Sequence, residues 1–429
     1  MCRYRPRVLR GFGAVFVAAF ALLAAVPAQA SAGAQFGIQD DAWLMYGPGT
    51  LTERVTTIQS LGAGLVRFTL RWDRVSPSKP ADVRDPDDPT YNWGVSGEVL
   101  DALHERGIPV LLTLYGSPRW ANGGGGPNVL PTSDFGDFAT AAAARFPWIR
   151  LWTAWNEPNT RTFSSPVSPS AYVTQVLNPA YTALHAASRA NRVAGGVTSP
   201  RKTPTGMSPL AFLQGMQAAH ARLDAYAQNP YPLSRVETPS RDSCSTCGYF
   251  TMARLAEIRS YVTRAFGPKP IWLTEYGYQT NPPDTLLGVS EALQAKYIGD
   301  AALRVWQQRG VTMLIQFLVR DEPNVGNWQS GLLTVGGVAK LSYHAFALPL
   351  AQVSRHGSSV VLWGQVRPGS GRRRYVLQRS VGAGWRPIGA SARTSAGGVF
   401  MRTVTLPRGA RVRISALAVG WTSPPLRLS

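Results

Sequence analysis

The chain is poor in cysteine and histidine. Its 429 residues include 3 Cys and 5 His, and after Cys2 the only cysteines are Cys244 and Cys247 in SCSTCGYF. A structural zinc site needs four such ligands, and the scattered His residues do not supply them, so no metal site is predicted. A thioredoxin-like redox pair would open a helix after an early strand, whereas this pair lies in a polar, serine-rich stretch. We therefore favour a small disulfide that pins a loop.

Long apolar runs are also lacking, except at the N-terminus. There, Gly11–Val26 is an apolar run of 16 residues between four arginines and the small-x-small sequence Ala28–Ala30. This run is shorter than the about 20 residues that a membrane-spanning helix needs. The pattern predicts a secretion signal over residues 1–30, cut near Ala30, and an uncleaved anchor is the alternative. We expect an exported protein with no membrane span after cleavage.

Acidic residues are scarce and unevenly placed. The chain has 24 Asp and Glu against 44 Lys and Arg, which gives a formal net charge of +20. Residues 351–429 contain 13 Arg and no Asp, Glu or Lys, so they hold most of the excess. This distribution argues against nucleic-acid binding by the whole protein. It favours a basic accessory module that could bind an anionic cell-envelope polymer, and a plain packing domain is the alternative.

A glycine-rich phosphate fingerprint does not follow the first apolar run, and GGGG at 123–126 predicts only a flexible loop. Instead, residues 31–350 alternate short apolar runs with segments of helical period. The runs are AQFGI, GLVRFTL, PVLLTL, IRLWTAW, RVAGGV, LDAYAQ, PIWLTE and TMLIQFL. Buried parallel strands have this near-continuous apolar character, and eight such units fit a (β/α)₈ TIM barrel. A doubly wound sheet is the alternative.

The period changes to two after residue 350. Segments such as SSVVLWGQV, RRRYVLQRS, GVFMRTVTL and ARVRISALAV alternate apolar and polar residues, with Gly and Pro between them. This pattern predicts a small all-β sandwich over residues 351–429. The expected architecture is a signal over residues 1–30, a barrel over residues 31–350 and a basic β-sandwich.

Two glutamates stand at the ends of predicted barrel strands. Glu157, in LWTAWNEPNT, follows the fourth strand, and Glu275, in PIWLTEYGYQT, ends the seventh. Polar residues at the carboxyl ends of barrel strands are typically catalytic, and strands four and seven face one another across a barrel. Glycosidic cleavage requires one protonated and one ionised carboxyl group in this arrangement. The alternative is that each glutamate pairs with an arginine on the rim.

The motifs WNEPN and WLTEYGY resemble the acid/base and nucleophile motifs of clan A glycoside hydrolases, the retaining (β/α)₈ enzymes, with families 5 and 39 the most similar. The resemblance covers residues 35–350. It implies that Glu157 is the general acid/base, that Glu275 is the nucleophile, and that Asn156 binds the sugar 2-hydroxyl.

Further positions match or depart from these families. Arg67, in LVRFTLRW, matches an arginine near the nucleophile and would keep it ionised. Tyr231, in AQNPYP, matches a tyrosine that hydrogen-bonds the nucleophile. Asn229 departs from the His of many relatives, and Phe317 stands where a Trp commonly forms the sugar platform.

Other residues near strand ends are candidates for substrate contact. Trp120 and Trp328 follow strands three and eight, where each either stacks on a sugar or packs its loop. Asp321 and Glu322 are competing rim carboxylates. The sequence thus predicts a secreted retaining glycoside hydrolase that acts on a polysaccharide or glycoside and uses no cofactor or metal. The alternative is a non-catalytic carbohydrate-binding or cell-envelope protein on the same scaffold.

Overall fold

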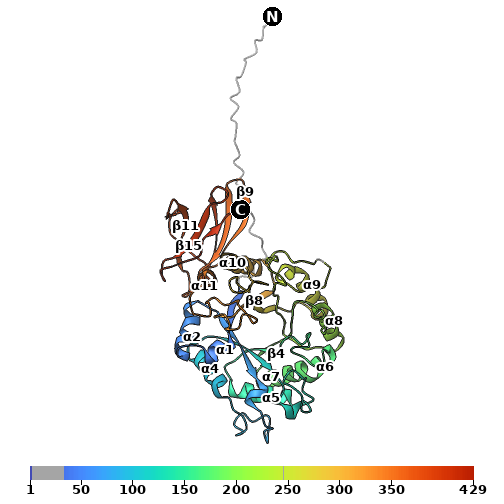
Figure 1. Ribbon diagram of the computed structural model, residues 1–429. Coiled ribbons are helices and arrows are strands. Elements are labelled where there is room, and N and C mark those ends of the chain that lie inside the picture. Colours follow the sequence, from blue (N-terminus) through green and yellow to red (C-terminus); the bar gives the residue numbers. More distant parts are fainter. Residues whose placement is uncertain (2–32, 245) are drawn as a thin grey trace.

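The computed structural model describes Met1, residues 33–244 and residues 246–429. The predicted secretion signal therefore lies outside the described residues, apart from Met1. The described chain forms a parallel barrel followed by an antiparallel all-β region (Figure 1). In these described ranges we find no helix with the length and apolar character to cross a membrane.

Eight strands form the barrel, each paired in parallel with its neighbours in chain order, and β8 closes on β1. They are β1 (Gln35–Gln39), β2 (Leu65–Arg71), β3 (Val110–Tyr115), β4 (Leu151–Ala154), β5 (Arg192–Thr198), β6 (Ala225–Gln228), β7 (Ile271–Tyr276) and β8 (Val311–Phe317). All eight coincide with the predicted apolar runs. The prediction of a TIM barrel is confirmed, and the doubly wound alternative is excluded because the sheet closes on itself.

The helices cover the outside of the barrel (Figure 1). They are α1 (Asp41–Tyr46), α2 (Leu51–Ser60), α3 (Trp72–Val75), α4 (Gly94–Glu105), α5 (Phe135–Arg145), α6 (Pro169–Tyr172), α7 (Asn178–Ala187), α8 (Pro209–Ala218), α9 (Leu255–Phe266), α10 (Glu291–Gln307) and α11 (Leu341–Ala347), with short segments η1 (Arg119–Ala121), η2 (Val173–Leu177) and η3 (Met252–Arg254). N-terminal capping residues mark the start of several of these helices. Thr50 and Glu53 form a capping box on α2, and Ser208 and Ser290 cap α8 and α10.

The barrel interior is filled by side chains from alternate strand positions. One buried cluster consists of Leu65, Leu111, Ala194, Val197, Ala225, Ala227, Trp272, Met313 and Ile315. Because side chains in a strand alternate between faces, Leu65 and Arg67 point to the same side of β2. Arg67 therefore enters the barrel interior above an apolar layer, near the carboxyl ends of the strands.

The C-terminal region contains two antiparallel sheets, as the period-two pattern predicted. β9 (Leu350–His356), β10 (Ser359–Gln365) and β14 (Val399–Thr405) form one sheet in the order β14-β10-β9. The other contains β11 (Arg374–Val381), β12 (Gly384–Pro387), β13 (Ala392–Arg393), β15 (Arg411–Ala416), β16 (Trp421–Thr422) and β17 (Leu426–Arg427). The strand β9 begins at Leu350, directly after α11.

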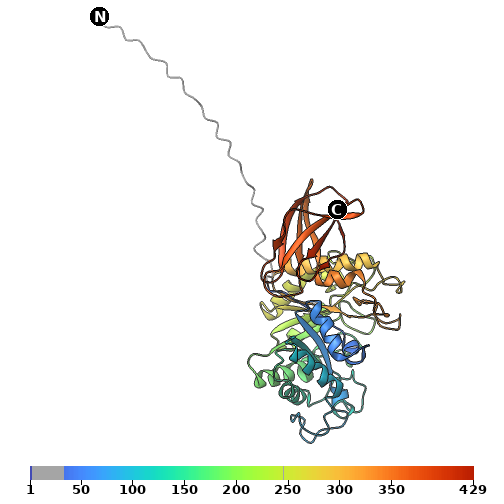
Figure 2. The same cartoon turned by 90° about the vertical axis from the view of Figure 1, so that its left-hand side faces the viewer.

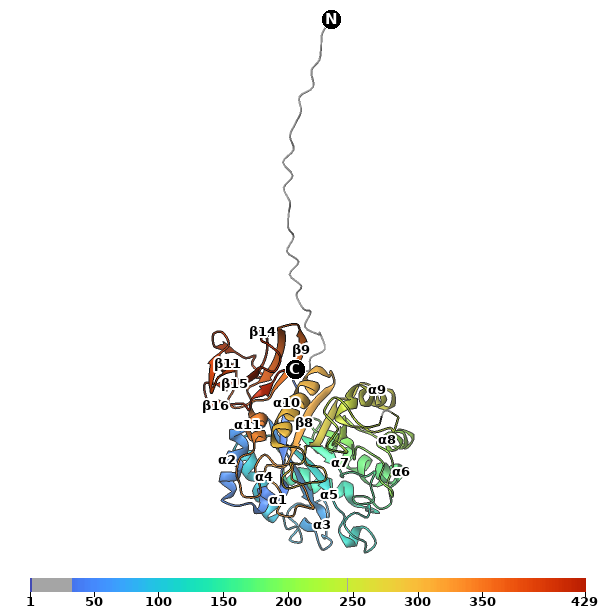
Figure 3. The ribbon, with the colours of Figure 1, turned by 45° about the horizontal axis from the view of Figure 1, so that its top comes forward.

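The two parts share one continuous hydrophobic core. Figures 2 and 3 show the C-terminal sheets against α10 and α11 at one side of the barrel. Arg367 is inserted at this junction, with its guanidinium 4.1 Å from the ring centroid of Phe36 and 4.5 Å from that of Phe346. Such cation–π contacts join the C-terminal region to the barrel.

Candidate active site

A cavity of about 580 Å³ opens among the loops that follow the barrel strands. Most of the residues predicted from the sequence meet there. Those that line it are Asn156, Glu157, Tyr231, Glu275, Phe317 and Trp328, and Arg67 lies fully buried behind them, in contact with Asn156 and Glu275. Residues far apart in the chain thus form one polar and aromatic site.

Glu275 receives a hydrogen bond at each carboxylate oxygen. The Nη1 of Arg67 donates to Oε1 in an ion pair, and the hydroxyl of Tyr231 donates to Oε2 at 3.0 Å. Burial and the neighbouring Glu275 raise the pKa of Tyr231 well above its usual value, so Tyr231 remains a proton-bearing donor. The carboxyl group of Glu275 thus receives one charged donor, from Arg67, and one neutral donor, from Tyr231.

Arg67 is itself held in place by two strands and by the segment that follows β4. Its Nη1 donates to Oε1 of Gln39 at 2.7 Å, its Nε to Oγ1 of Thr113 at 3.0 Å, and its Nη2 to Oδ1 of Asn156 at 2.8 Å. The last contact fixes the orientation of the Asn156 amide, because only its oxygen can accept. The amide N–H groups of Asn156 are then available to a hydroxyl in the cavity.

The backbone after β4 leaves strand geometry to present Glu157. Trp155 and Glu157 have positive φ angles of 74° and 40°, which are costly for residues with a side chain. Surrounding contacts hold them. Trp155 is fully buried with its indole N–H donating to the carbonyl of Phe163 at 2.7 Å, and the backbone N–H of Glu157 donates to the carbonyl of Val197 at 2.9 Å. The strained turn aims a carboxyl group into the cavity.

The environment of Glu157 favours its protonated form. Although part of its surface faces the cavity, the side chain lies deep in the protein, and burial together with Glu275 raises the pKa of Glu157 to about 8. The Nδ2 of Asn229 donates to Oε1 of Glu157 at 3.1 Å and opposes this shift. Thr274 orients that amide by donating to Oδ1 of Asn229 at 2.8 Å. Two glutamates in one cavity thus occupy opposite electrostatic environments.

Three aromatic rings form a wall beside Glu275. The ring centroids of Tyr231 and Trp328 are 4.7 Å apart with planes inclined by 31°, and the Phe317 ring lies 5.5 Å from Trp328 in an edge arrangement. Trp328 is half-buried, so part of its surface faces the cavity. The wall combines the predicted Phe317 position with a tryptophan supplied by the following loop.

Trp120 lies outside this group. Its indole N–H donates to the carbonyl of Ser76 at 2.9 Å, and its ring packs edge-on against Trp72 with centroids 5.3 Å apart. Within the described ranges it does not line the cavity. Its loop holds the indole against α3, so the structure does not bring Trp120 to this cavity, and its role in substrate binding stays a prediction.

Some residues of the site were missed by the sequence reasoning. Gln39 orients Arg67, and Arg71 and Tyr115 line the cavity, where Arg71 forms an ion pair with Asp73. Gln39, Arg71 and Tyr115 all line the cavity, and each is the last residue of a barrel strand. This position is the signal that would have selected them. Asp40 also lines the cavity, and its carboxylate caps α1 and accepts hydrogen bonds from the backbone of the loop after β8.

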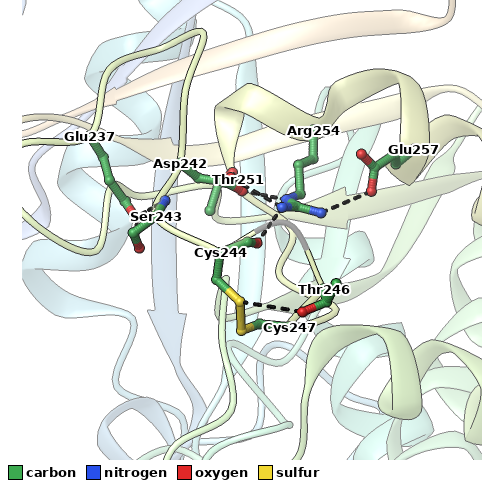
Figure 4. The surroundings of a disulfide bond; sticks show 9 residues. All are labelled: Glu237, Asp242, Ser243, Cys244, Thr246, Cys247, Thr251, Arg254 and Glu257. Atoms are coloured by element: carbon green, nitrogen blue, oxygen red, sulfur yellow. Dashed lines mark hydrogen bonds and ion pairs between the residues drawn. A yellow bond between two sulfur atoms is a disulfide. The ribbon is translucent and has the colours of Figure 1, made fainter.

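Cys244 and Cys247 are joined by a disulfide in the long loop after β6 (Figure 4). Arg254 contacts this loop through an ion pair with Asp242 and donates a hydrogen bond to the carbonyl of Cys244. The same loop begins with Asn229 and contains Tyr231. Among the described residues, no three His, Cys, Asp or Glu side chains are grouped to hold a metal ion.

Comparisons with known proteins agree with the fold. No family model matches the sequence. A putative beta-glucosidase 17 of Oryza sativa subsp. japonica is 29% identical over 127 residues, which span 28% of this chain and 39% of the rice protein.

Solved structures match most of the chain at low identity. A family 39 glycoside hydrolase from Bacteroides cellulosilyticus superposes with a TM-score of 0.59 at 15% identity, covering 87% of this chain and 81% of that one. A monomeric beta-xylosidase from Caulobacter crescentus gives 0.57 at 17%, covering 88% and 96%. A beta-glucosidase from Pyrococcus furiosus gives 0.52 at 14%, covering 74% and 95%. The chain thus shares its fold with clan A glycoside hydrolases.

Proposed function

We propose that the protein is a retaining glycoside hydrolase that cleaves the O-glycosidic bond of a polysaccharide or glycoside by double displacement. The contrast between its two glutamates supports this most strongly. Glu157, with a pKa of about 8, holds a proton at neutral pH, and Glu275 is ion-paired to Arg67. A retaining glycosidase needs this pairing of an acid with an ionised nucleophile.

In the first step, a carboxylate oxygen of Glu275 attacks the anomeric carbon while Glu157 donates its proton to the leaving oxygen. A glycosyl-enzyme ester on Glu275 results. Glu157, now ionised, accepts a proton from the water that attacks the anomeric carbon, and Glu275 leaves as a carboxylate. The free N–H groups of Asn156 would bind the sugar 2-hydroxyl, and the aromatic wall would carry the ring.

The solved neighbours support the reaction class, since their names include a beta-xylosidase and a beta-glucosidase. Screening aryl glycosides and polysaccharides with wild-type protein is the first test. Glu157→Gln and Glu275→Gln should each lose about 10²–10⁴-fold in turnover while keeping the thermal transition of wild type. Glu98→Gln, which changes an exposed carboxylate of α4 away from the cavity, serves as control and should keep turnover. Wild-type rates in either glutamate variant would exclude the mechanism.

We also propose that the protein is exported and that its C-terminal region binds an anionic cell-envelope polymer. Export is supported by the N-terminal sequence and predicts a secreted protein whose first residue lies near Ser31, which N-terminal sequencing would check. Polymer binding is supported by the 13 Arg without any Asp, Glu or Lys after residue 350. Arg411 and Arg427 lie directly opposite one another across β15 and β17, and both are exposed.

Cosedimentation with cell walls that carry anionic polymer tests this binding. We expect the full-length protein to bind at low salt and to be released as ionic strength rises, because screening weakens contacts between exposed charges. One variant replaces the C-terminal arginines Arg408, Arg411 and Arg427 with Gln, and the control replaces the barrel arginines Arg150, Arg189 and Arg222. The first should weaken binding to the cell wall more than the control. Equal binding by both variants would contradict the proposal.

A further inference from the structure

A buried ion pair lies next to Gln329, the residue that follows Trp328 of the aromatic wall. The Nζ of Lys340 is 2.7 Å from both carboxylate oxygens of Asp321, and the two side chains are only 1% and 3% exposed. Lys340 precedes α11, and Asp321 lies in the loop after β8. Removing two charges from water costs about as much as their attraction returns, so such a pair adds little stability and its position calls for another explanation.

The ammonium group of Lys340 reaches three segments of the chain. Besides Asp321, it donates to Oγ1 of Thr280 at 2.7 Å, in the loop after β7, and to the carbonyl of Gln329 at 3.1 Å. Lysine carries three donors, and all three have acceptors here. On the other side of the pair, Oδ1 of Asp321 accepts from the backbone N–H of Gly331 at 2.9 Å. The pair therefore fixes the loop at Gln329 and Gly331.

Both the backbone and the side chain of Gln329 are hydrogen-bonded. Its backbone N–H donates to Oε1 of Gln279 at 3.0 Å, and its carbonyl accepts from the backbone N–H of Thr280 at 3.1 Å as well as from Lys340. Its side-chain amide donates to the carbonyls of Glu322 at 3.0 Å and Asn324 at 3.1 Å. The residue before it, Trp328, is consequently fixed at its C-terminal side.

Trp328 connects this network to the nucleophile. Its ring lies 4.7 Å from that of Tyr231, whose hydroxyl donates to Glu275. A path of contacts thus runs from the buried pair through Gln329, Trp328 and Tyr231 to the carboxylate.

We propose that Lys340 and Asp321 are positioning residues that hold Trp328 against Tyr231 as the sugar platform of the cavity. The proposal rests on the proposed glycosidase function only for the role of the platform; the placement of Trp328 by the pair can be measured without activity. Neither residue faces the cavity, so both act through Trp328.

Fluorine NMR of protein labelled with 5-fluorotryptophan tests the placement. The Trp328 resonance is the one missing from Trp328→Phe. The double variant Lys340→Met with Asp321→Leu replaces the pair with apolar side chains, a change that proteins often tolerate. We expect the Trp328 resonance to shift or broaden while the other resonances and the thermal transition stay near those of wild type.

Two further variants keep this test decisive. Lys296→Met removes the pair between exposed Lys296 and half-buried Asp300 in α10 and should leave the Trp328 resonance unchanged. Thr280→Val removes one hydrogen-bond acceptor of Lys340 but keeps the ion pair with Asp321. It should therefore fold even if the double variant does not. Its Trp328 resonance should also shift. If the double variant folds and its Trp328 resonance is unchanged, the proposal is overturned, whatever the activity. If the double variant does not fold, an unchanged Trp328 resonance in Thr280→Val overturns it.

Kinetics test the consequence for substrate. On an aryl glycoside that wild type hydrolyses, the double variant should raise KM about tenfold, because an ordered aromatic contact is lost, with kcat little changed. Trp328→Ala should do the same, and combining the changes should add little, as for residues that act as one unit. Effects that multiply would contradict the proposal. A wild-type protein without glycosidase activity would instead refute the proposed function.

Discussion

Asn229 donates to Glu157, while Arg67 and Tyr231 donate to Glu275. At the scale of single residues, the proposed chemistry depends on this difference in partners. A neutral amide only partly offsets the burial of Glu157, so its pKa stays near 8, whereas Glu275 has a guanidinium as its ion-pair partner. Asn229 is the position where the sequence departs from the His expected from the resemblance to clan A motifs, and it directly contacts the proposed acid.

Replacing Asn229 with Ala should move the pH profile. The hydrogen bond from Asn229 stabilises ionised Glu157 and so lowers its pKa; without it, that pKa should rise above about 8, by about one unit. Because Glu157 must be protonated to donate, the alkaline limb of kcat/KM should move to higher pH. Profiles from pH 5 to 10 would show this, and a limb that stays or moves to lower pH would contradict the assignment of Glu157 as the acid.

At the scale of elements, strands and their ends could be predicted, because buried parallel strands leave apolar runs and functional residues follow them. This rule selected Glu157 and Glu275, which the structure brings into one cavity. It could not find the contact of Asn229 with Glu157 or that of Lys340 with Thr280, which join residues 72 and 60 positions apart. It also could not foresee that Trp120 packs away from this cavity, because the path of a loop decides whether its tryptophan reaches the cavity.

Close packing of α10 against β9 gives an element-scale prediction. A Cβ on Gly299 would lie 2.5 Å from the carbonyl oxygen of Leu350, so Gly299→Ala should force the helix from the sheet. Overpacking of this kind costs about 1–3 kcal/mol, which exceeds the about 1 kcal/mol by which Ala favours a helix over Gly.

Thermal unfolding checks this expectation. Gly299→Ala should lower Tm more than Gly97→Ala, in α4, where the nearest atom is a side-chain carbon at 3.2 Å. A Gly299→Ala protein as stable as wild type would show that α10 and β9 do not pack as described.

At the scale of the whole molecule, the cavity lies in the barrel and the basic charge lies on the C-terminal sheets, and the two parts share one hydrophobic core. The barrel carries the glutamates and the aromatic wall, and the C-terminal sheets carry the unpaired excess of arginine. Arg367 and the shared apolar core hold these parts together. This arrangement would keep the cavity at a fixed position relative to a surface that the basic region binds.

The most direct test of the whole account is to trap the covalent intermediate. A 2-deoxy-2-fluoro analogue of the best aryl glycoside, with a good leaving group, should form a glycosyl ester that hydrolyses slowly. We predict that the intact mass rises by one fluoroglycosyl group and that peptide mapping places this group on Glu275. A label on another residue, or inversion of the product anomer without any label, would contradict the assignment of Glu275 as nucleophile.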